Sequence, residues 1–469
     1  MFEGYVKPDN RASEDTIAAI STPRGIGGIG IIRVSGTKAE HICHLLFKPE
    51  KDAGPLKDRY LYHGTIISPE TKEVIDEVLV SLMRNPHSYT GEDTVEINCH
   101  GGILILETVL NEVVKAGARP ALPGEFTKRA FLNNRIDLSQ AEAVIDVISA
   151  QTEKGLNIAL SHLRGDLSKT IEKLRESLLE ILSHLEISID FTDDDIEQVP
   201  YEAIAGKIEN INQDIMKILS TYTEGKLYRN GLKVLITGKP NVGKSSLLNR
   251  LIGEKRAIVT PIPGTTRDFI EETISIMGLP VNFIDTAGIR DVDTIVEKEG
   301  IDLVWEKAES ADLIMVLLDG SVELTEEDRE VIERNRGRKI VLVVNKSDLP
   351  AHWEDAELHR LLPDVRPLRV SAKYGIAIEE LKKMIYNLAS NHADSFGSDV
   401  VVANLRHKLA LEKVTELLTQ AGNSIIKGLS PELPAFDIRE ALDSIGEIVG
   451  ITTNEDVLNR IFSNFCIGK

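Results

Sequence analysis

Short apolar runs alternate with helix-like stretches near the start of the chain. Residues 29–34, 78–82 and 95–97 are apolar runs of strand length, and residues 103–114 show the apolar spacing of a helix. Strand-length runs mixed with helical segments are typical of a compact α+β domain. The pattern therefore predicts such a domain between residue 16 and about residue 123.

The pattern changes near Arg129, where long segments almost free of proline and glycine begin. Apolar residues here recur at steps of three and four, as expected for a helix with one buried face. The clearest series is Ile171, Leu174, Leu178, Ile181 and Leu185. We therefore predict that this region is helical.

Helical spacing returns later, in residues 402–418, 438–448 and 455–462. One helical domain interrupted by an inserted domain explains both helical regions, because insertion is tolerated where chain termini lie close together. Two separate helical domains are the alternative. The predicted segments are 1–128 for the N-terminal domain, 129–229 for the first helical part, 230–390 for the insertion and 391–469 for the second helical part.

A phosphate-binding loop follows the apolar run at residues 233–237. Residues 238–245 read G-K-P-N-V-G-K-S and match the pattern G-x-x-x-x-G-K-[ST]. The backbone N–H groups of such a loop cradle phosphates, Lys244 can reach the β and γ oxygens, and the Ser245 hydroxyl can ligate Mg²⁺. The predicted binding residues here are Asn241, Val242, Gly243, Lys244, Ser245 and Ser246.

Two downstream segments have the residues of nucleotide-sensing switches. The Thr266 hydroxyl can close over Mg²⁺ and the γ-phosphate. The later D-x-x-G motif offers Asp285 to the Mg²⁺ shell and Gly288 to the γ-phosphate. The predicted GTP-binding residues of both segments are Thr260, Pro261, Ile262, Pro263, Gly264, Thr265, Thr266, Asp285, Thr286, Ala287 and Gly288.

A base-reading site follows the apolar run at residues 339–344, which is typical of a buried parallel strand. The Asp348 carboxylate can accept from both the ring N–H and the exocyclic amine of guanine. Adenine would leave that acid unpaired, at a cost of roughly a few kcal/mol. The sequence therefore predicts GTP rather than ATP. The predicted guanine-site residues are Asn345, Lys346, Ser347, Asp348, Ser371, Ala372 and Lys373.

These ordered motifs predict a Ras-like P-loop GTPase domain, with a mostly parallel sheet and helices on both faces, inside a multidomain α/β protein. Ras-type enzymes orient the attacking water with a glutamine just after D-x-x-G, but Ile289 stands there and cannot form a side-chain hydrogen bond. Another group must act. Residues 290–299 offer several acids, although a structural salt bridge is the alternative role for each.

Composition narrows the functional classes. The 469 residues, 42% of them hydrophobic, allow about three domains, and no apolar run is long enough to span a bilayer. The start lacks a secretory pattern, so we expect a cytoplasmic protein with no membrane partner. Cys43, Cys99 and Cys466 are widely spaced, which argues against disulfides and a cysteine zinc site. The net charge of −20 means that a local basic patch or a second protein must supply most contacts to any RNA.

Weaker motifs have simpler interpretations. Residues 25–30 fit a dinucleotide-loop pattern but lead into an apolar strand, so we interpret them as a tight loop. His41 and His44 lack a second ligand pair and are interpreted as ordinary helix-surface residues. The acidic run 190–197 lacks the glycine and spacing of a calcium loop, so we interpret it as a solvated connector. From physics alone, Cys466 is favoured as a buried small residue near a frayed end over a reactive thiol.

The motif order, the insertion and the ending F-C-I-G-K together closely resemble the tRNA modification GTPase family called MnmE or TrmE. The resemblance covers essentially the whole chain, and the C-terminal pentapeptide is its most specific part. The other family-like signatures are G-G-I-G-I-I-R at 27–33, Y-T-G-E-D at 89–93, H-G-G at 100–102 and P-G-E-F-T-K-R-A-F-L-N at 123–133.

The resemblance implies an N-terminal domain that binds 5-formyl- or methylene-tetrahydrofolate and forms a homodimer. It also implies a partner, MnmG or GidA, which uses FAD and NADH and joins a heterotetramer. Together they would place a carboxymethylaminomethyl or aminomethyl group on carbon 5 of wobble uridine 34 in certain tRNAs. The resemblance implies that the residues contacting folate are Arg33, Glu96, Arg135 and Lys469. It also implies that Cys466 is a catalytic candidate. Arg135 stands where the family can have lysine.

The resemblance also implies how GTP hydrolysis is catalysed. The family pattern selects Glu297 to position or polarise water, beside Lys244 in the phosphate loop. The family uses K⁺ in place of an arginine finger, in a site formed when two GTPase domains meet. The matching K⁺ ligands are Asn241, Thr260, Ile262 and Thr265, and the expected Mg²⁺ ligands are Ser245 and Thr266.

Two other functions stay open. An assembly GTPase that binds ribosomal RNA or a ribosomal protein would need neither the N-terminal domain nor the Cys466 tail. A folate-dependent one-carbon transferase acting on another substrate would bind folate without altering tRNA nucleosides.

Overall fold

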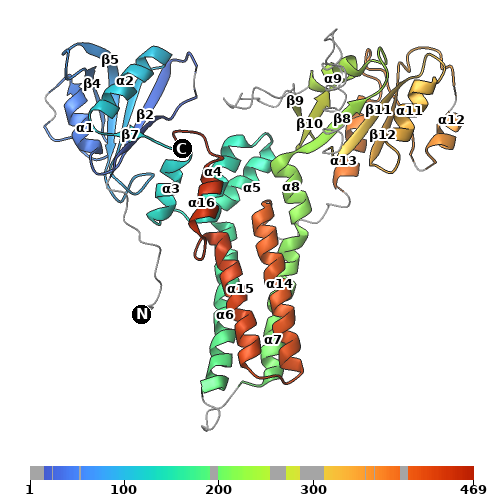
Figure 1. The fold of residues 1–469 in the computed structure, drawn as a ribbon. Coiled ribbons are helices and arrows are strands. Elements are labelled where there is room, and N and C mark those ends of the chain that lie inside the picture. The colour runs from blue at the N-terminus through green and yellow to red at the C-terminus, as the bar shows by residue number, and fades with distance from the viewer. Residues whose placement is uncertain are drawn as a thin grey trace. The chain divides into compact units, whose positions relative to one another are not determined.

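A computed structural model of the chain describes residues 15–23, 25–51, 54–190, 199–253, 271–285, 311–353, 355–363, 365–390 and 400–469. The chain divides into two compact units. Unit 1 comprises Met1–Ile145, His162–Ser183 and Ile438–Lys469, and unit 2 comprises Asp146–Ser161 and His184–Asp437. Figure 1 shows the ribbon of the described elements.

Unit 1 contains a seven-stranded sheet with the order β3-β4-β5-β6-β2-β1-β7 in the described part of the chain. Its strands are β1 Ile17–Ile20, β2 Ile29–Ser35, β3 Phe47–Pro49, β4 Leu61–Ile67, β5 Val74–Met83, β6 Thr94–His100 and β7 Arg119–Pro120. All neighbours are antiparallel except β1 and β7. The predicted α+β class of this region is confirmed.

The two faces of this sheet carry different residues because side chains alternate along each strand. On one face, Ile32 of β2 and Ile97 of β6 join the core formed with α1 (Ala39–Leu46) and α2 (Ile103–Lys115). On the other face, Ile17 and Ala19 of β1 pack with Phe126. Arg33 follows Ile32 in β2, so its side chain belongs to this second face.

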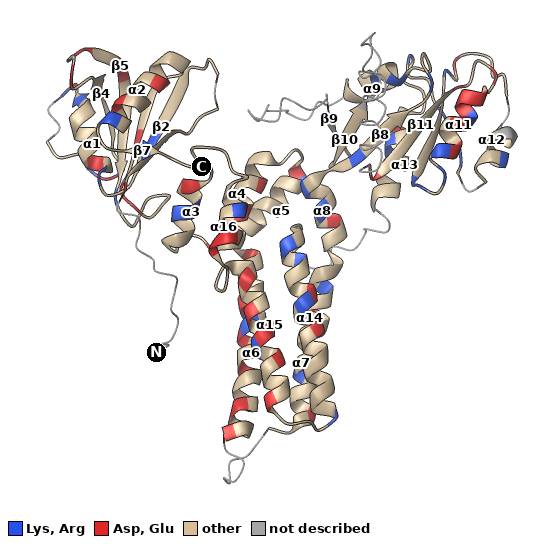
Figure 2. Ribbon diagram, in the orientation of Figure 1, with Lys and Arg blue, Asp and Glu red and all other residues tan. Residues whose placement is uncertain are grey.

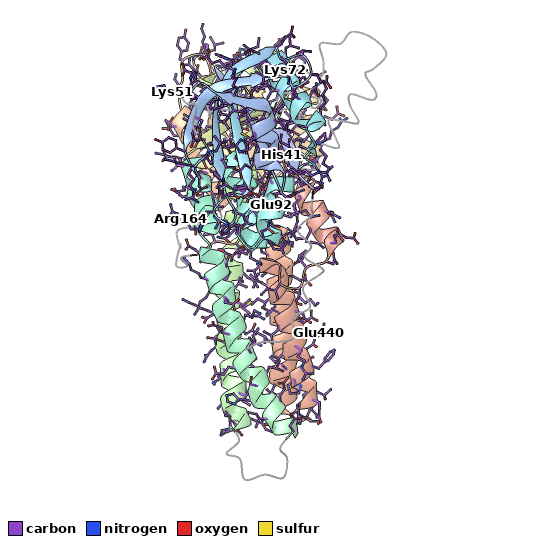
Figure 3. The ribbon with its side chains drawn as sticks, turned by 90° about the vertical axis from the view of Figure 1, so that its left-hand side faces the viewer. His41, Lys51, Lys72, Glu92, Arg164 and Glu440 are labelled. Atoms are coloured by element: carbon purple, nitrogen blue, oxygen red, sulfur yellow. The ribbon has the colours of Figure 1, made fainter. Side chains whose placement is uncertain are left out.

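The helix α3 (Glu125–Leu132) is tied to the N-terminal sheet by a buried arginine. Arg129 is 5% exposed, and its Nη1 donates to both Glu92 carboxylate oxygens at 3.2 and 3.1 Å. Its Nη2 donates to Asp15 Oδ1 at 2.8 Å. Figure 3 labels Glu92 on this part of unit 1. A buried charge must be paired in this way to be tolerated, so the network fixes α3 on the sheet.

Helices dominate both predicted helical regions. Before the GTPase segment they are α4 Leu138–Ser149, α5 Glu153–Leu163, α6 Asp166–Asp190, α7 Tyr201–Ser220 and α8 Tyr222–Asn230. After it they are α14 Leu405–Ile426, α15 Glu432–Val449 and α16 Glu455–Phe462. All five residues of the predicted apolar stripe on α6 are buried. Apart from Asp190, the acidic run lies outside the described residues.

Within unit 2, α7 from the first helical region packs against α14 from the second. A Cβ at Gly422 of α14 would lie only 3.8 Å from Ile208 Cγ2 of α7. Such packing is what an interrupted helical domain requires. The predicted domain boundaries themselves stay a prediction, and the one after residue 128 falls inside α3.

Unit 2 also contains a six-stranded sheet with the order β13-β12-β11-β8-β10-β9 among the described residues. Its strands are β8 Leu232–Thr237, β9 Glu271–Ile276, β10 Leu279–Asp285, β11 Leu313–Asp319, β12 Ile340–Asn345 and β13 Leu368–Arg369. Every pairing is parallel except that of β9 with β10. This is the mostly parallel sheet that the motifs predict.

Helices cover both faces of this sheet: α9 Lys244–Ile252, α11 Glu326–Arg334, α12 Asp355–Leu361 and α13 Ile378–Ser390. Met315 and Leu317 of β11 pack into the core shared with α9 and α13. Alternate residues, such as Ile314 and Val316, pack into the core shared with α11 and α12. The uninterrupted apolar sequence of β11 therefore follows from burial on both sides. No described helix has the length and apolar character needed to cross a membrane.

Candidate functional site

The phosphate loop joins β8 directly to α9 in unit 2. Gly243 is the N-cap of α9 with φ +98°, and Asn241 has φ +64°. A Cβ at Gly238 would lie 2.3 Å from the Leu317 carbonyl oxygen, and one at Gly243 would lie 2.3 Å from Asn345 Nδ2. Both positions therefore require glycine because backbone and buried polar groups approach closely. The resulting turn directs the N-terminus of α9 into the loop, where an anion is stabilised.

Side chains of the loop divide into buried and accessible groups. Val242 is fully buried in the core, so only its backbone can face a ligand. Asn241, Ser245 and Ser246 are exposed. The Lys244 ammonium donates to the carbonyls of Gly238 and Lys239, both at 2.9 Å, and is thus held across the loop.

Asn345 connects the phosphate loop to the predicted guanine pocket. It ends β12 and is 3% exposed. Its Nδ2 donates to the Val242 carbonyl at 2.8 Å, and its Oδ1 accepts from the Ala372 N–H at 3.0 Å. The buried amide therefore holds three separate segments together, because leaving either polar group unpaired would be costly.

Asp348, the predicted base-reading residue, is held by a hydrogen bond from a buried serine. Ser371 Oγ donates to Asp348 Oδ1 at 2.6 Å, and Ser371 is fully buried. The Ser347 N–H donates to the Val370 carbonyl at 3.0 Å, which fixes the backbone beside Asp348. One carboxylate oxygen is thus held by the protein while the group retains acceptor capacity for guanine.

Two residues that the sequence reasoning missed support this pocket. Lys346 Nζ donates to Asp319 Oδ2 at 2.6 Å. Burial raises the pKa of Asp319, but hydrogen bonds from Lys346 and Ser321 outweigh it and hold that pKa below its usual value. Arg250 of α9 donates to the Ala372 carbonyl at 3.0 Å. The sequence does contain a signal for Asp319, because this residue ends the apolar run of β11, which pairs in parallel with β12 and places Asp319 opposite Asn345. The sequence contains no comparable signal for Arg250.

A second constellation lies in unit 1, on the face of the sheet opposite α1 and α2. Arg33 of β2 and Glu96 of β6 are directly paired in register. Arg33 Nε and Nη2 both donate to Glu96 Oε1, at 2.9 and 2.7 Å. The guanidinium carbon lies 5.5 Å from the Tyr89 ring centre and 5.7 Å from that of Phe126. The rings and the carboxylate thus fix the guanidinium in place.

The C-terminal tail reaches the same constellation. The Gly468 carbonyl accepts from Ser21 Oγ at 3.1 Å and lies 3.5 Å from Arg33 Nη1. Burial and the neighbouring Arg33 charge lower the pKa of the Lys469 ammonium. Arg33, Glu96 and Lys469 are thus brought together from distant parts of the sequence. Arg135 is exposed, and its Nε donates to the Ser88 carbonyl at 3.1 Å, one residue before Tyr89.

The three cysteines differ in accessibility. Cys43 and Cys99 are buried, and burial raises the pKa of each thiol to about 12. Cys466 is exposed in the tail. The expectation that Cys466 is buried is therefore wrong, because the neighbouring Phe465, rather than Cys466, enters the core of this region. Cys466 is the accessible thiol of the chain.

Comparisons with known proteins agree over nearly the whole chain. A family model described as MnmE helical domain matches residues 138–466, and one described as GTP-binding protein TrmE N-terminus matches residues 16–135. A tRNA modification GTPase MnmE of Syntrophus aciditrophicus is 55% identical, covering 97% of this chain and 100% of the relative. One from Alkaliphilus oremlandii is 47% identical, covering 97% and 99%.

This chain belongs to the MnmE family of tRNA modification GTPases. Membership, the phosphate loop and the mostly parallel sheet together make it a GTP-hydrolysing enzyme. The resemblance inferred from the motifs is thereby confirmed, as is the multidomain fold class.

Several predicted GTPase residues lie outside the described residues. Asp285 ends β10, and nothing is described of its side chain. The others are Thr260, Pro261, Ile262, Pro263, Gly264, Thr265, Thr266, Thr286, Ala287, Gly288 and Glu297. The ligand and catalytic roles of these residues stay predictions, as do the K⁺ role of Asn241 and the Mg²⁺ role of Ser245.

The weaker motifs have local structural roles. The Gly27 N–H donates to the Gly101 carbonyl at 3.1 Å, and the glycine loop leads into β2 rather than into a helix. His41 and His44 lie on exposed positions of α1, and His41 is labelled in Figure 3. Among the described residues, no group of three metal-ligating side chains is found.

Proposed function

We propose that this chain uses GTP hydrolysis to support modification of carbon 5 of wobble uridine 34 in certain tRNAs. The product would be a carboxymethylaminomethyl or aminomethyl uridine. The curated relatives are named tRNA modification GTPases, which supports tRNA as the substrate class. The observation that carries the proposal is the return of the tail, with Cys466 and Lys469, to the Arg33–Glu96 pair.

The unit 1 constellation fits a folate. Both hydrogen bonds from Arg33 to Glu96 end on Oε1, so Oε2 can accept from the paired N–H donors of a pterin. Lys469 and Arg135 add cations that can meet anionic groups of the ligand. A 5-formyl- or methylene-tetrahydrofolate would supply the one-carbon unit there. The chain would bind and orient it through these residues and present the exposed Cys466 thiol nearby.

The unit 2 site would hold GTP and two cations. Lys244 and the N–H groups of the loop would stabilise the phosphates, while the exposed Ser245 hydroxyl would ligate Mg²⁺. The amide oxygen of Asn241, also exposed, suits K⁺, and Thr260, Ile262 and Thr265 would complete that shell. Glu297 would position the attacking water. GTP turnover should therefore be faster in K⁺ than in Na⁺, and equal rates would count against the K⁺ site.

The contacts to tRNA phosphates must come from a local basic patch or from a second protein, because the chain is acidic overall. Figure 2 shows acidic residues, in red, at several positions along α15. They are Glu432, Asp437, Glu440, Asp443 and Glu447, against the basic Arg439. That helix would repel RNA. We propose that the chain forms a homodimer and that an FAD- and NADH-dependent MnmG protein joins it in a heterotetramer. This partner would supply the basic surface for tRNA. The proposed reaction takes place in the cytoplasm.

Mass spectrometry of tRNA nucleosides tests the proposal. Cells lacking the protein should lose aminomethyl-type wobble uridines. Wild type should restore them, and Cys466→Ser should not. Unchanged nucleosides in the deletion strain would reject the tRNA function and favour a ribosome-assembly GTPase switch. Folate binding with unchanged nucleosides would instead favour a one-carbon transferase acting on another substrate.

A further inference from the structure

The last residues of the chain are held at two points on unit 1. At the first, the Cys466 carbonyl accepts from the Gly124 N–H at 3.4 Å. At the second, the Gly468 carbonyl accepts from Ser21 Oγ at 3.1 Å. Cys466 is exposed and Gly468 is buried, so the tail first lies on the protein surface and its backbone then becomes buried at Gly468.

Each attachment point contains a glycine that cannot be replaced without movement. Gly468 has φ +94°, and a Cβ there would lie 2.5 Å from the Ile20 carbonyl oxygen and 2.9 Å from Ser21 Cα. Gly124 has φ +65°, and a Cβ there would lie 2.7 Å from the Phe462 carbonyl oxygen. The nearest obstructing atom at each position is a backbone carbonyl oxygen, which cannot rotate away as the end of a side chain can. The left-handed conformation also disfavours any L side chain at both positions.

Upstream of the tail, aromatic packing anchors the end of the chain. Phe462 of α16 and Phe465 are buried in one cluster with Leu138, and their ring centres are 5.4 Å apart. Lys128 Nζ of α3 donates to Asn459 Oδ1 of α16 at 2.8 Å. Figure 1 shows the C-terminus leaving α16 close to α3. The segment after Phe465 is therefore short and tethered at its start, so its direction depends on the attachments beyond it.

We propose that Ser21 and Gly468 are positioning residues that latch the tail, so that Lys469 and the Cys466 thiol stay beside the Arg33–Glu96 pair. Neither residue needs to touch a ligand. Ser21 supplies the hydrogen bond, and the absent side chain of Gly468 lets the backbone come close enough to accept it. The consequence for folate rests on the proposed function, whereas the latch itself does not.

The test uses the full chain with Gly468→Ala, Ser21→Ala and Ser21→Thr. Gly117→Ala is the matched control, because Gly117 has φ +115° in the same unit but a Cβ there would meet nothing within 4 Å. Tail release is followed directly as the rate at which carboxypeptidase B removes Lys469. Affinity for 5-formyl-tetrahydrofolate is measured by titration calorimetry.

We expect Gly468→Ala to speed removal of Lys469 and weaken folate binding, each about tenfold, because the new Cβ would collide with the Ile20 carbonyl and push the tail away from Ser21. Ser21→Ala should change both about threefold, as loss of one neutral hydrogen bond does. Ser21→Thr retains the hydroxyl and should restore both, and Gly117→Ala should match wild type. If Gly468→Ala does not fold, the Ser21 pair decides the question.

Equal rates of Lys469 removal in wild type, Ser21→Ala and Gly468→Ala would overturn the latch. A released tail with unchanged folate affinity would overturn its positioning role. If wild type binds no folate, the proposed function fails at that point, and the latch is still judged by the removal rates alone.

Discussion

Consecutive residues between β8 and α9 build most of the phosphate loop. By contrast, the site formed by Arg33, Glu96 and Lys469, called the tail site here, joins residues from both ends of the chain. The loop is recognisable because one strand–turn–helix segment supplies both the N–H groups and the lysine. The tail site exists only after the sheet of unit 1 and the C-terminal segment have come together. A local site survives small shifts elsewhere in the fold, but an assembled site depends on every attachment that brings its parts together.

Removing the loop lysine should produce the largest effect. Lys244→Ala should lower kcat for GTP hydrolysis by about 10²–10³-fold, because the cation that offsets charge on the transferred phosphate is lost. Steady-state phosphate release measures it. Lys217→Ala, which removes an exposed lysine of α7 paired with Asp214, is the control and should retain the wild-type rate. A comparable kcat in both variants would refute the local model of this site.

Base recognition should respond next. Asp348→Asn should weaken GTP binding about 10²-fold, because guanine would face a donor where it needs an acceptor, at a cost of roughly 3 kcal/mol. Xanthosine triphosphate should gain affinity, since the exocyclic carbonyl oxygen on C2 of xanthine can accept from the new amide. Competition titration with both nucleotides measures the ratio. An unchanged preference for GTP would show that Asp348 does not read the base.

The assembled site should show a smaller loss from a single change. Glu96→Gln should weaken 5-formyl-tetrahydrofolate binding roughly tenfold, because a charge-assisted acceptor is replaced by a neutral amide that also releases Arg33. Titration calorimetry measures the affinity. Glu107→Gln, on an exposed position of α2, is the matched control. Equal folate affinity in both variants would remove Glu96 from the site.

The smallest predicted effect concerns pH. The pKa of Asp319 is lower in the folded protein than its usual value, so its ionised form stabilises the fold above about pH 4. That contribution is lost as the pH falls through the folded pKa. Asp319→Asn should therefore flatten the acid dependence of the unfolding midpoint of the GTPase unit. Differential scanning calorimetry from pH 3 to 7 measures it, and parallel curves for wild type and variant would contradict the prediction.

The sequence predicted the strand and helix elements of the GTPase segment where each is formed by contiguous residues. The run ending in Asn345 was correctly predicted to be a buried parallel strand, because an uninterrupted apolar run of strand length is typical of a strand that is covered on both faces. The bridging role of the Asn345 amide was not predictable, since Val242 and Ala372 approach it only in the folded sheet. Arg250 was missed for the same reason.

At the tail, physical reasoning from the sequence alone misjudged Cys466. A short C-terminal segment has no periodicity from which burial can be inferred, and Phe465 rather than Cys466 turned out to be the buried neighbour. Family resemblance named Arg33, Glu96 and Lys469. It did not name Ser21, and it included Tyr89 only within a signature, without a role, although contacts of both residues hold the site together.

The sequence by itself determined the class of nucleotide site, the helical character of the flanking regions and the alternation that places Arg33 and Glu96 on one face of their strands. Those properties depend on spacing along the chain, which strand and helix periodicity converts directly into geometry. The tertiary structure alone decided that β2 pairs with β6 in the register that joins Arg33 to Glu96, and that the tail reaches them. Contacts between distant segments depend on how whole surfaces pack, and no local pattern contains that information.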